Sequence, residues 1–288
     1  MKICAVVFTY PGDYPKAIRL TQNMKDYVDD IFFCIETKHK DVPLPDWASP
    51  LVFDFDRCSQ LHGTEAIIGM KKVYTTLIEQ GYDAIIKLDS DTLVLRPDQY
   101  IVPLELGSDF VYIKRYTKTK EGEHVRRCNG CCYALSANAV KLLNEYPSNV
   151  FDAVMYQCDR HEDMVFSTLL TNIPEVHIHE VNKSKIWWSV VPYRKSDCIA
   201  CHFGYCDIAR IDEELKQFAP LSRDIAFSQE TNNFIKTVID YCTKNNIPMK
   251  EYKNLYDKNG KELTEVQKEN IVQSETKKND ISKRPSIY

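Results

Sequence analysis

Two aspartates, Asp89 and Asp91, flank Ser90 directly after the apolar run at 83–88. Carboxylates at this spacing just beyond a buried strand face one crevice together, and their hard oxygens suit Mg²⁺ or Mn²⁺. Such an ion neutralises a diphosphate leaving group. The same pattern also occurs in solvated turns that cap a following element. The apolar run before it and the apolar stretch at 93–95 favour the metal site.

Strand and helix patterns alternate through the first third of the chain. This alternation is typical of a mostly parallel sheet with helices on both faces, so the predicted fold class is α/β. Ligands of such sheets bind at the carboxyl ends of the strands, where the two aspartates lie. The predicted strands are 2–8, 30–36, 51–55 and 83–88, and the predicted helices are 14–27 and one that Thr64 caps and Gly81 closes.

The rest of the chain is less regular and is predicted to continue the same domain. Its predicted strands are 109–114, 131–135 and 176–181, its helices 136–145 and 162–170, with a charged loop over 115–127. From 221 onward the pattern is helical but increasingly polar, and the end of the chain is charged and poorly patterned. We expect a domain over 1–220, a helical C-terminal appendage over 221–265 and a mobile charged tail over 266–288.

The composition is that of an ordinary globular protein, with 37 basic and 41 acidic residues and a net charge of -4. This balance argues against holding nucleic acid by bulk charge alone. The 11 cysteines are scattered, and we expect them to be buried and reduced instead of forming a zinc site. The first apolar run is too short for a signal peptide, and no run approaches the ~20 residues of a membrane helix. A cytoplasmic protein is therefore expected.

The run KLDSDTLVL at 87–95 resembles the Asp-x-Asp segment of GT-A glycosyltransferases, and is closest in wording to the glycogenin-like and bacterial galactosyltransferase family. The likeness extends over about residues 1–205, at a few motifs. It implies a GT-A, Rossmann-like fold in which Asp89 contacts the ribose and the metal and Asp91 holds the metal. Lys72 matches in spacing a basic residue that reaches the donor in the family, with neighbouring Lys71 as the alternative.

The third metal ligand of the family is a histidine in a His-x-x-Gly-like context late in the domain. The segment Cys201-His202-Phe203-Gly204 has one residue fewer between the histidine and the glycine. The resemblance thus implies His202 as a ligand, and a packed core histidine stays the alternative.

The segment NGCCYALS at 129–136 resembles the Gly-x-x-Tyr-x-Leu-Ser acceptor-side segment common in GT-A enzymes. It implies that Asn129 and Gly130 lie on the acceptor side, where glycine lets the backbone approach a sugar. Ser136 would cap the following helix.

Glu162 and Asp163 resemble the Glu-Asp motif of inverting GT-A families, in which an acid removes the proton of the acceptor hydroxyl. Acids at a helix start also act simply as partners of the helix dipole. The Asp-x-Asp-Thr-Leu-Val wording favours a retaining family and the Glu-Asp motif an inverting one. The stereochemistry is therefore left open.

Thr9, Tyr10 and Asp13 follow the first strand, where base and ribose would lie in this fold. The Tyr10 ring can stack on uracil, and Asp13 can bind ribose or shape the turn; UDP is implied by the resemblance alone. Trp187 and Trp188 offer an aromatic face for a sugar or a base, with a place in the core as the alternative.

Together these observations predict a hexosyl- or pentosyltransferase that uses Mn²⁺ or Mg²⁺ to move a sugar from a UDP-sugar to a hydroxyl of a glycan, a protein or a hydroxylated DNA base. The nucleic-acid acceptor depends on the cations of Lys114–Arg127, which also suit a solvated loop. One alternative is a nucleotidyltransferase, although TYPGDYPK is a poor phosphate loop. The other is a non-catalytic nucleotide-sugar-binding module, against which the intact Asp-x-Asp argues.

Overall fold

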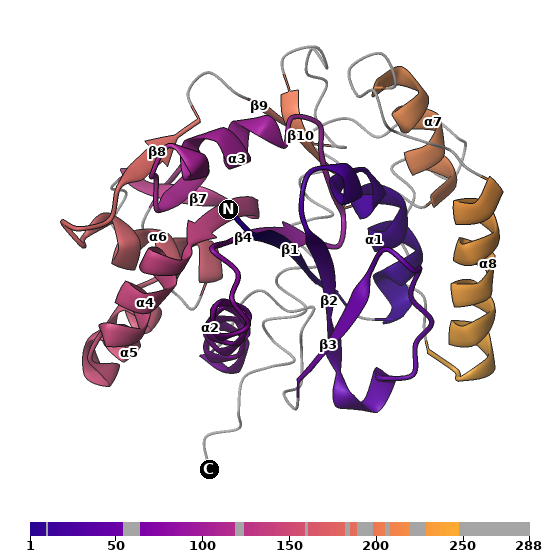
Figure 1. Cartoon of the computed structure of the whole chain (residues 1–288), viewed down its shortest axis with the longest axis horizontal. Coiled ribbons are helices and arrows are strands. Elements are labelled where there is room, and N and C mark those ends of the chain that lie inside the picture. Colours follow the sequence, from indigo (N-terminus) through magenta and orange to yellow (C-terminus); the bar gives the residue numbers. More distant parts are fainter. Residues whose placement is uncertain are drawn as a thin grey trace.

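The computed structural model describes residues 1–9, 11–53, 64–118, 124–158, 161–181, 185–188, 198–204, 208–218 and 229–247. A seven-stranded sheet forms the centre of the molecule, and helices cover both of its faces (Figure 1). This arrangement confirms the predicted α/β fold class, with a mostly parallel central sheet. Among the described helices, none combines the length and apolar character needed to span a bilayer.

The central sheet has the strand order β3-β2-β1-β4-β7-β6-β8. The first four strands pair in parallel, β7 is antiparallel to both neighbours, and β8 runs parallel to β6. The carboxyl ends of β1 and β4 therefore lie side by side, with Phe8 paired to Asp89. The strands are β1 (Ile3–Phe8), β2 (Asp30–Glu36), β3 (Ser49–Phe53), β4 (Ala84–Asp89), β6 (Phe110–Lys118), β7 (His124–Ser136) and β8 (Ile178–Glu180).

Two apolar clusters hold the helices on the sheet. On one face, side chains of α2, α4, α5 and α6 pack on alternate residues of the strands, and on the other face those of α1, α3 and α8 do the same. These helices are α1 (Tyr14–Thr21), α2 (Thr64–Glu79), α3 (Asp98–Glu105), α4 (Ala137–Glu145), α5 (Ser148–Gln157), α6 (Glu162–Thr171) and α8 (Gln229–Lys244). Short 3-10 helices lie at Pro11–Asp13, Gln22–Asp26 and Thr37–His39.

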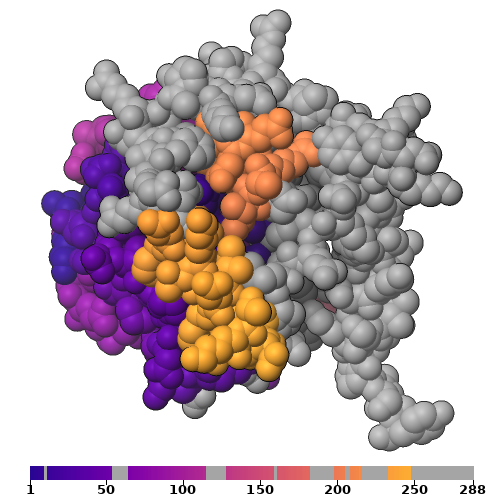
Figure 2. All heavy atoms as spheres, turned by 90° about the vertical axis from the view of Figure 1, so that its right-hand side faces the viewer, coloured from indigo at the N-terminus to yellow at the C-terminus, as the bar shows by residue number. Residues whose placement is uncertain are grey.

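A smaller sheet of three strands stands beside the main one, in the order β5-β10-β9. Its strands are β5 (Thr92–Val94), β9 (Lys185–Trp188) and β10 (Cys198–His202), and a third apolar cluster joins it to α1 and α7 (Ile208–Phe218). Because β5 follows β4 after a two-residue turn, this sheet carries β10 to the carboxyl edge of the main sheet. Helix α8 packs against α1 on the outside of the molecule (Figure 2).

The predicted charged loop over 115–127 is wrong. Strand β6 continues to Lys118, β7 begins at His124, and the two strands pair antiparallel out to Lys118 opposite His124. A backbone ladder needs only extended chain, so a charged segment can prolong a strand that starts in the core at Phe110. Helix α5 was not predicted either, and the predicted helix 14–27 becomes α1 followed by a 3-10 helix.

The predicted division of the chain stays a prediction. Helix α8 lies in the expected appendage, yet its Ile235, Val238 and Cys242 belong to the same apolar cluster as α1. The expected tail over 266–288 lies outside the described residues.

Helix α4 begins as the sequence predicts, with Ser136 as its N-cap. The Ser136 hydroxyl accepts a hydrogen bond of 3.1 Å from the Ala139 amide and donates one of 2.6 Å to Asp109. We predict that Ser136→Ala lowers the free energy of unfolding by about 1–2 kcal/mol, because a helix amide and a buried carboxylate both lose a partner. Urea denaturation measures this. The control is Ser148→Ala at the exposed start of α5, expected within about 0.5 kcal/mol of wild type; equal effects would contradict the cap.

Candidate active site and metal centre

The Asp-x-Asp segment closes strand β4. Asp89 is the last residue of β4, and Ser90 and Asp91 form the turn to β5. Ser90 and Asp91 are 8% and 7% exposed, so the segment is not a solvated turn. Its carboxylates lie at the carboxyl edge of the parallel strands, the place where α/β sheets bind ligands.

His202 reaches the same place from the smaller sheet. It is the last residue of β10 and lies opposite Thr92 of β5, and its Nε2 is 3.2 Å from Asp91 Oδ1. A backbone hydrogen bond also holds the two segments together, since the Phe203 amide donates to the Asp91 carbonyl at 2.7 Å. One ligand atom each of Asp89, Asp91 and His202 lies within 4.8 Å of the other two.

This group of atoms fits a single divalent ion. Ligand bonds of about 2.0–2.3 Å place the ligands of one ion within such a span of one another. Two carboxylates suit Mg²⁺ or Mn²⁺, and an imidazole nitrogen suits transition ions. The donor set therefore fits Mn²⁺ better than Mg²⁺.

Gly204 leaves room for the His202 ring. A Cβ added at Gly204 would lie 2.7 Å from His202 Cε1 and 3.3 Å from Asp91 Oδ2. The Gly204 amide lies 3.3 Å from His202 Nδ1, and His202 Nε2 lies 3.2 Å from Asp91 Oδ1. The close approach of the His202 ring thus explains why a residue without a side chain occupies position 204.

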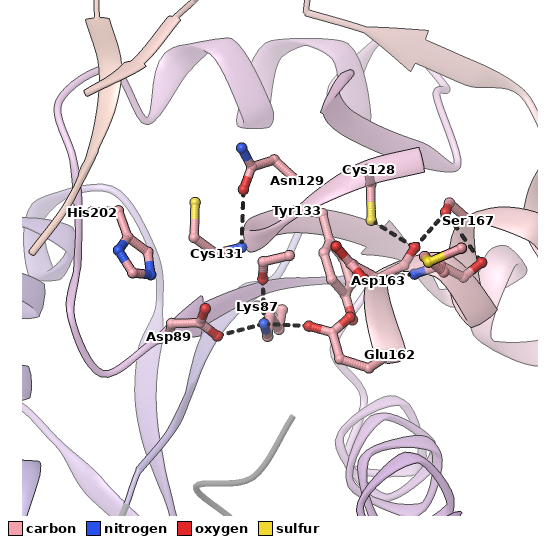
Figure 3. A network of polar contacts seen from close by, with 12 residues as sticks. Lys87, Asp89, Cys128, Asn129, Cys131, Tyr133, Glu162, Asp163, Ser167 and His202 are labelled. Carbon is pink, nitrogen blue, oxygen red and sulfur yellow. Dashed lines mark hydrogen bonds and ion pairs between the residues drawn. The ribbon is translucent and has the colours of Figure 1, made fainter. Parts of the chain in front are cut away.

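Lys87 is the buried residue of this candidate site that the sequence reasoning missed. Its side chain is buried on β4 and shares a strand face with Asp89, two residues on (Figure 3). The ammonium contacts Asp89 Oδ1 at 2.5 Å and Glu162 Oε1 at 2.7 Å, and it also donates to the Gly130 carbonyl. The sequence feature that could have identified it is a lysine inside an apolar strand, two residues before an aspartate.

The Glu-Asp pair and the glycine segment meet at this lysine. Glu162 and Asp163 open helix α6, where the helix dipole favours acids. Glu162 is 2% exposed, whereas Asp163 is half-buried and its Oδ1 accepts from the Met164 amide at 2.8 Å. Gly130 packs directly on both acids, since an added Cβ would lie 3.1 Å from Asp163 Cβ and 3.2 Å from Glu162 Oε1.

Asn129, beside this glycine, is buried, and its side-chain oxygen accepts from the Cys131 amide at 3.5 Å. Asn129 is therefore adjacent in sequence to the glycine that packs on the Glu-Asp pair, but its own side chain serves the backbone of β7. Cys128, also on β7, donates to the Asp163 carbonyl at 3.2 Å. Strand β7 therefore contacts the start of α6 both through this hydrogen bond and through the packing of Gly130.

Burial shifts the titration of the ionisable groups in this candidate site. Burial raises the pKa of Glu162 to about 8, even though Lys87 opposes the shift. Burial likewise raises the pKa of Asp89 against the pull of Lys87. Burial by itself would lower the pKa of Lys87, but Asp89 and Glu162 outweigh it and hold that pKa well above its usual value. Lys87 therefore stays charged, and one ammonium faces several acids.

Thr9 and Asp13, two of the residues predicted to bind the nucleotide, follow β1 at the same edge of the sheet. Thr9 follows β1 and is buried, and Asp13 accepts a 3.0 Å hydrogen bond from Ser90. Lys16 lies 3.6 Å from Asp13. The structure thus brings Asp13 to the Asp-x-Asp turn. Tyr10 lies outside the described residues.

The remaining predicted residues lie apart from these contacts or are described only in their backbone. Lys72 is exposed on α2, and no described contact joins it to the acids of the site; Lys71 lies 4.8 Å from the Phe151 ring. Trp187 and Trp188 form β9 and pair with Cys201 and His202 of β10. Trp188 is therefore one strand away from the candidate ligand His202.

No protein family and no curated protein matches the sequence. Among solved structures, a glycosyltransferase involved in the glycosylation of the major capsid of PBCV-1 is similar at 12% identity, over 75% of this chain and 100% of that chain, with a TM-score of 0.43. A protein of Desulfovibrio desulfuricans G20, provisionally assigned as a nucleotide-diphospho-sugar transferase, is similar at 12% identity over 63% and 80%, with a TM-score of 0.36. Both are of the class that the sequence resembles, but likeness at this level assigns no activity to this chain.

Gly204→Ala tests the packing of His202. The added methyl group forces the ring away from Asp91, so we predict Mn²⁺ binding weaker by about tenfold or more. Electron paramagnetic resonance of free Mn²⁺ during titration measures the affinity. Gly107→Ala is the control: it meets open space but has φ +91°, so it costs stability without changing the Mn²⁺ affinity. Unchanged binding in Gly204→Ala would show that His202 does not need this position.

The raised pKa of Glu162 predicts a pH dependence of stability. The folded chain retains a proton up to about pH 8 that the unfolded chain loses near 4.5. The stabilisation that this proton gives to the folded chain is therefore complete below pH 4.5 and is lost as the pH rises toward 8. We predict that metal-free Glu162→Gln gains stability relative to wild type across this range, by at most about 1.4 kcal/mol per pH unit. Urea denaturation at a series of pH values measures the difference. If the free energies of unfolding of wild type and Glu162→Gln change in parallel with pH, the pKa of Glu162 is not raised.

Proposed function

We propose that this chain is a metal-dependent glycosyltransferase that moves a sugar from a nucleoside-diphosphate donor, with UDP as the nucleotide and Mn²⁺ as the metal, to a hydroxyl group. The observation that carries the proposal is the Asp89, Asp91 and His202 cluster at the carboxyl edge of the sheet. A divalent ion bound there would neutralise the charge of the leaving diphosphate.

The residues around the cluster support the donor side of this reaction. The Asp13–Ser90 hydrogen bond ties the segment after β1 to the Asp-x-Asp turn. A nucleoside that lies along this edge meets acceptors for ribose hydroxyls at Asp13 and Asp89, and its diphosphate lies toward the metal ligands. Trp188, on the strand next to His202, is proposed to lie beside the sugar or the base.

The acceptor side is proposed to lie at the start of α6. Of the two acids, Glu162 is almost fully buried beneath Lys87, whereas Asp163 retains partial exposure. Asp163 is therefore the better candidate to take the proton of an acceptor hydroxyl. Attack assisted by such a base in a single displacement inverts the anomeric centre, so the arrangement favours inversion. The acceptor is proposed only as a molecule that carries a hydroxyl group.

Removal of Asp91 tests the function. We predict that wild type releases UDP from a UDP-sugar in the presence of Mn²⁺, and that Asp91→Asn lowers the rate by about a hundredfold or more, since charge stabilisation by the metal is worth several kcal/mol. A screen of UDP-sugars for UDP release measures this. Asp98→Asn, which removes an acid paired with Arg96 at the exposed start of α3, is the matched control with an unchanged rate.

Two results would contradict the proposal. Release of pyrophosphate from a sugar phosphate and a nucleoside triphosphate would identify a nucleotidyltransferase. Binding of UDP with Mn²⁺ without turnover of any nucleotide sugar, with or without added acceptors, would identify a non-catalytic binding module.

A further inference from the structure

Lys87 is a buried cation in an otherwise apolar strand. Its side chain is 1% exposed, and its neighbours on β4 are Ile86 and Leu88. Removal of an ammonium from water costs several kcal/mol, which only close counter-charges and hydrogen bonds offset. A lysine at this position therefore has to be explained by its contacts.

The contacts use the full donor capacity of the ammonium. An ammonium has three N–H donors, and Lys87 meets three acceptors: Asp89 Oδ1 at 2.5 Å, Glu162 Oε1 at 2.7 Å and the Gly130 carbonyl. The face of the Tyr133 ring, 5.4 Å away, adds a further favourable contact. Figure 3 shows the ammonium between the two carboxylates.

These three acceptors belong to different parts of the site. Asp89 is one of the three candidate metal ligands at the end of β4. Gly130 lies on β7, and Glu162 opens α6 immediately before Asp163. One ammonium thus joins the metal cluster to the two acids proposed for the acceptor side. A carboxylate has two oxygens, so Asp89 can accept from Lys87 through Oδ1 and still offer an oxygen to a cation.

The surroundings leave the lysine little freedom. Gly130 packs so closely on Glu162 and Asp163 that even a Cβ would be crowded. Tyr133, which pairs with Lys87 across the strands, is itself hydrogen-bonded to Tyr74 at 2.8 Å. The lysine is therefore held from several sides, as are the carboxylates it contacts.

We propose that Lys87 is a positioning residue that orients Asp89 toward the cation and Glu162, with its neighbour Asp163, toward the acceptor, so that both halves of the site are assembled by one buried ammonium. This inference rests on the proposed function. It adds a residue that contacts neither metal nor substrate and acts through those that do.

Positioning and simple charge balance predict opposite changes in metal affinity. By Coulomb's law, loss of a nearby positive charge strengthens the binding of Mn²⁺. Loss of the group that orients a ligand weakens it, typically by tenfold or more. The sign of the change in Mn²⁺ affinity therefore separates the two roles when Lys87 alone is lost. In a variant that also loses the Glu162 carboxylate the charges cancel, so charge balance predicts little change in affinity and positioning still predicts weaker binding.

The informative variant is Lys87→Met combined with Glu162→Gln, because the second substitution removes a carboxylate that would otherwise lose its donor in the interior. Arg19→Met, which breaks a buried ion pair of 2.9 Å with Asp212 between α1 and α7, is the control for loss of a buried cation. Unfolding temperature and Mn²⁺ affinity, by electron paramagnetic resonance, are measured for both and for wild type. Lys87→Gln with Glu162→Gln replaces the first variant if it does not fold.

We expect the Lys87 variant to bind Mn²⁺ at least about tenfold more weakly than wild type, and Arg19→Met to lose stability without a change in affinity. Binding as tight as wild type or tighter would overturn the positioning role and leave the proposed function intact. If wild type itself neither binds Mn²⁺ nor releases UDP from a UDP-sugar, both the proposed function and this inference fail.

Discussion

Negative charge is concentrated at the end of strand β4, and the local structure is organised around its compensation. Lys87 is the buried cation that contacts two of the acids there, Asp89 and Glu162. Burial raises the pKa values of both acids, and Lys87 offsets this rise only in part. In the proposed function, a divalent ion at Asp89, Asp91 and His202 would add positive charge at this place.

The fold brings these groups together from three separate segments, namely β4 with the turn that follows it, β10 and α6. Strand β4 contributes Lys87 and Asp89, the turn after it Asp91, strand β10 His202, and helix α6 its first two acids. The parallel strands align their carboxyl ends, and the small sheet folds β10 back against β5 so that His202 comes opposite Thr92. Glycines at 130 and 204 allow the close approaches that complete the site.

Some of this could be predicted from the sequence, for physical reasons. Apolar strands followed by polar turns are locally encoded, so the main sheet and the place of Asp89 at its edge were predictable. The Ser136 cap was predictable because a serine before a helical pattern satisfies a free amide. The extension of β6 and β7 through 115–118 and 124–127 was not, because a charged segment lacks the apolar alternation that marks a strand and its backbone pairing does not depend on side-chain type.

The role proposed for Lys87 depends on its long-range contacts. A single lysine in a strand is compatible with an exposed edge, and its partner Glu162 lies 75 residues away. Lys72, on the preceding helix, was predicted as the basic residue because its spacing matches the family, and its exposure on α2 was not evident from the sequence. Burial of Lys87 becomes interpretable only when Glu162 and Gly130 are placed around it.

The most direct test of the account is anomalous diffraction at the manganese edge from crystals grown with Mn²⁺ and UDP. The account predicts one manganese peak bonded to Asp89, Asp91 and His202, in contact with the diphosphate. Bound UDP with these three side chains free of metal, or manganese bound at another place, would contradict it.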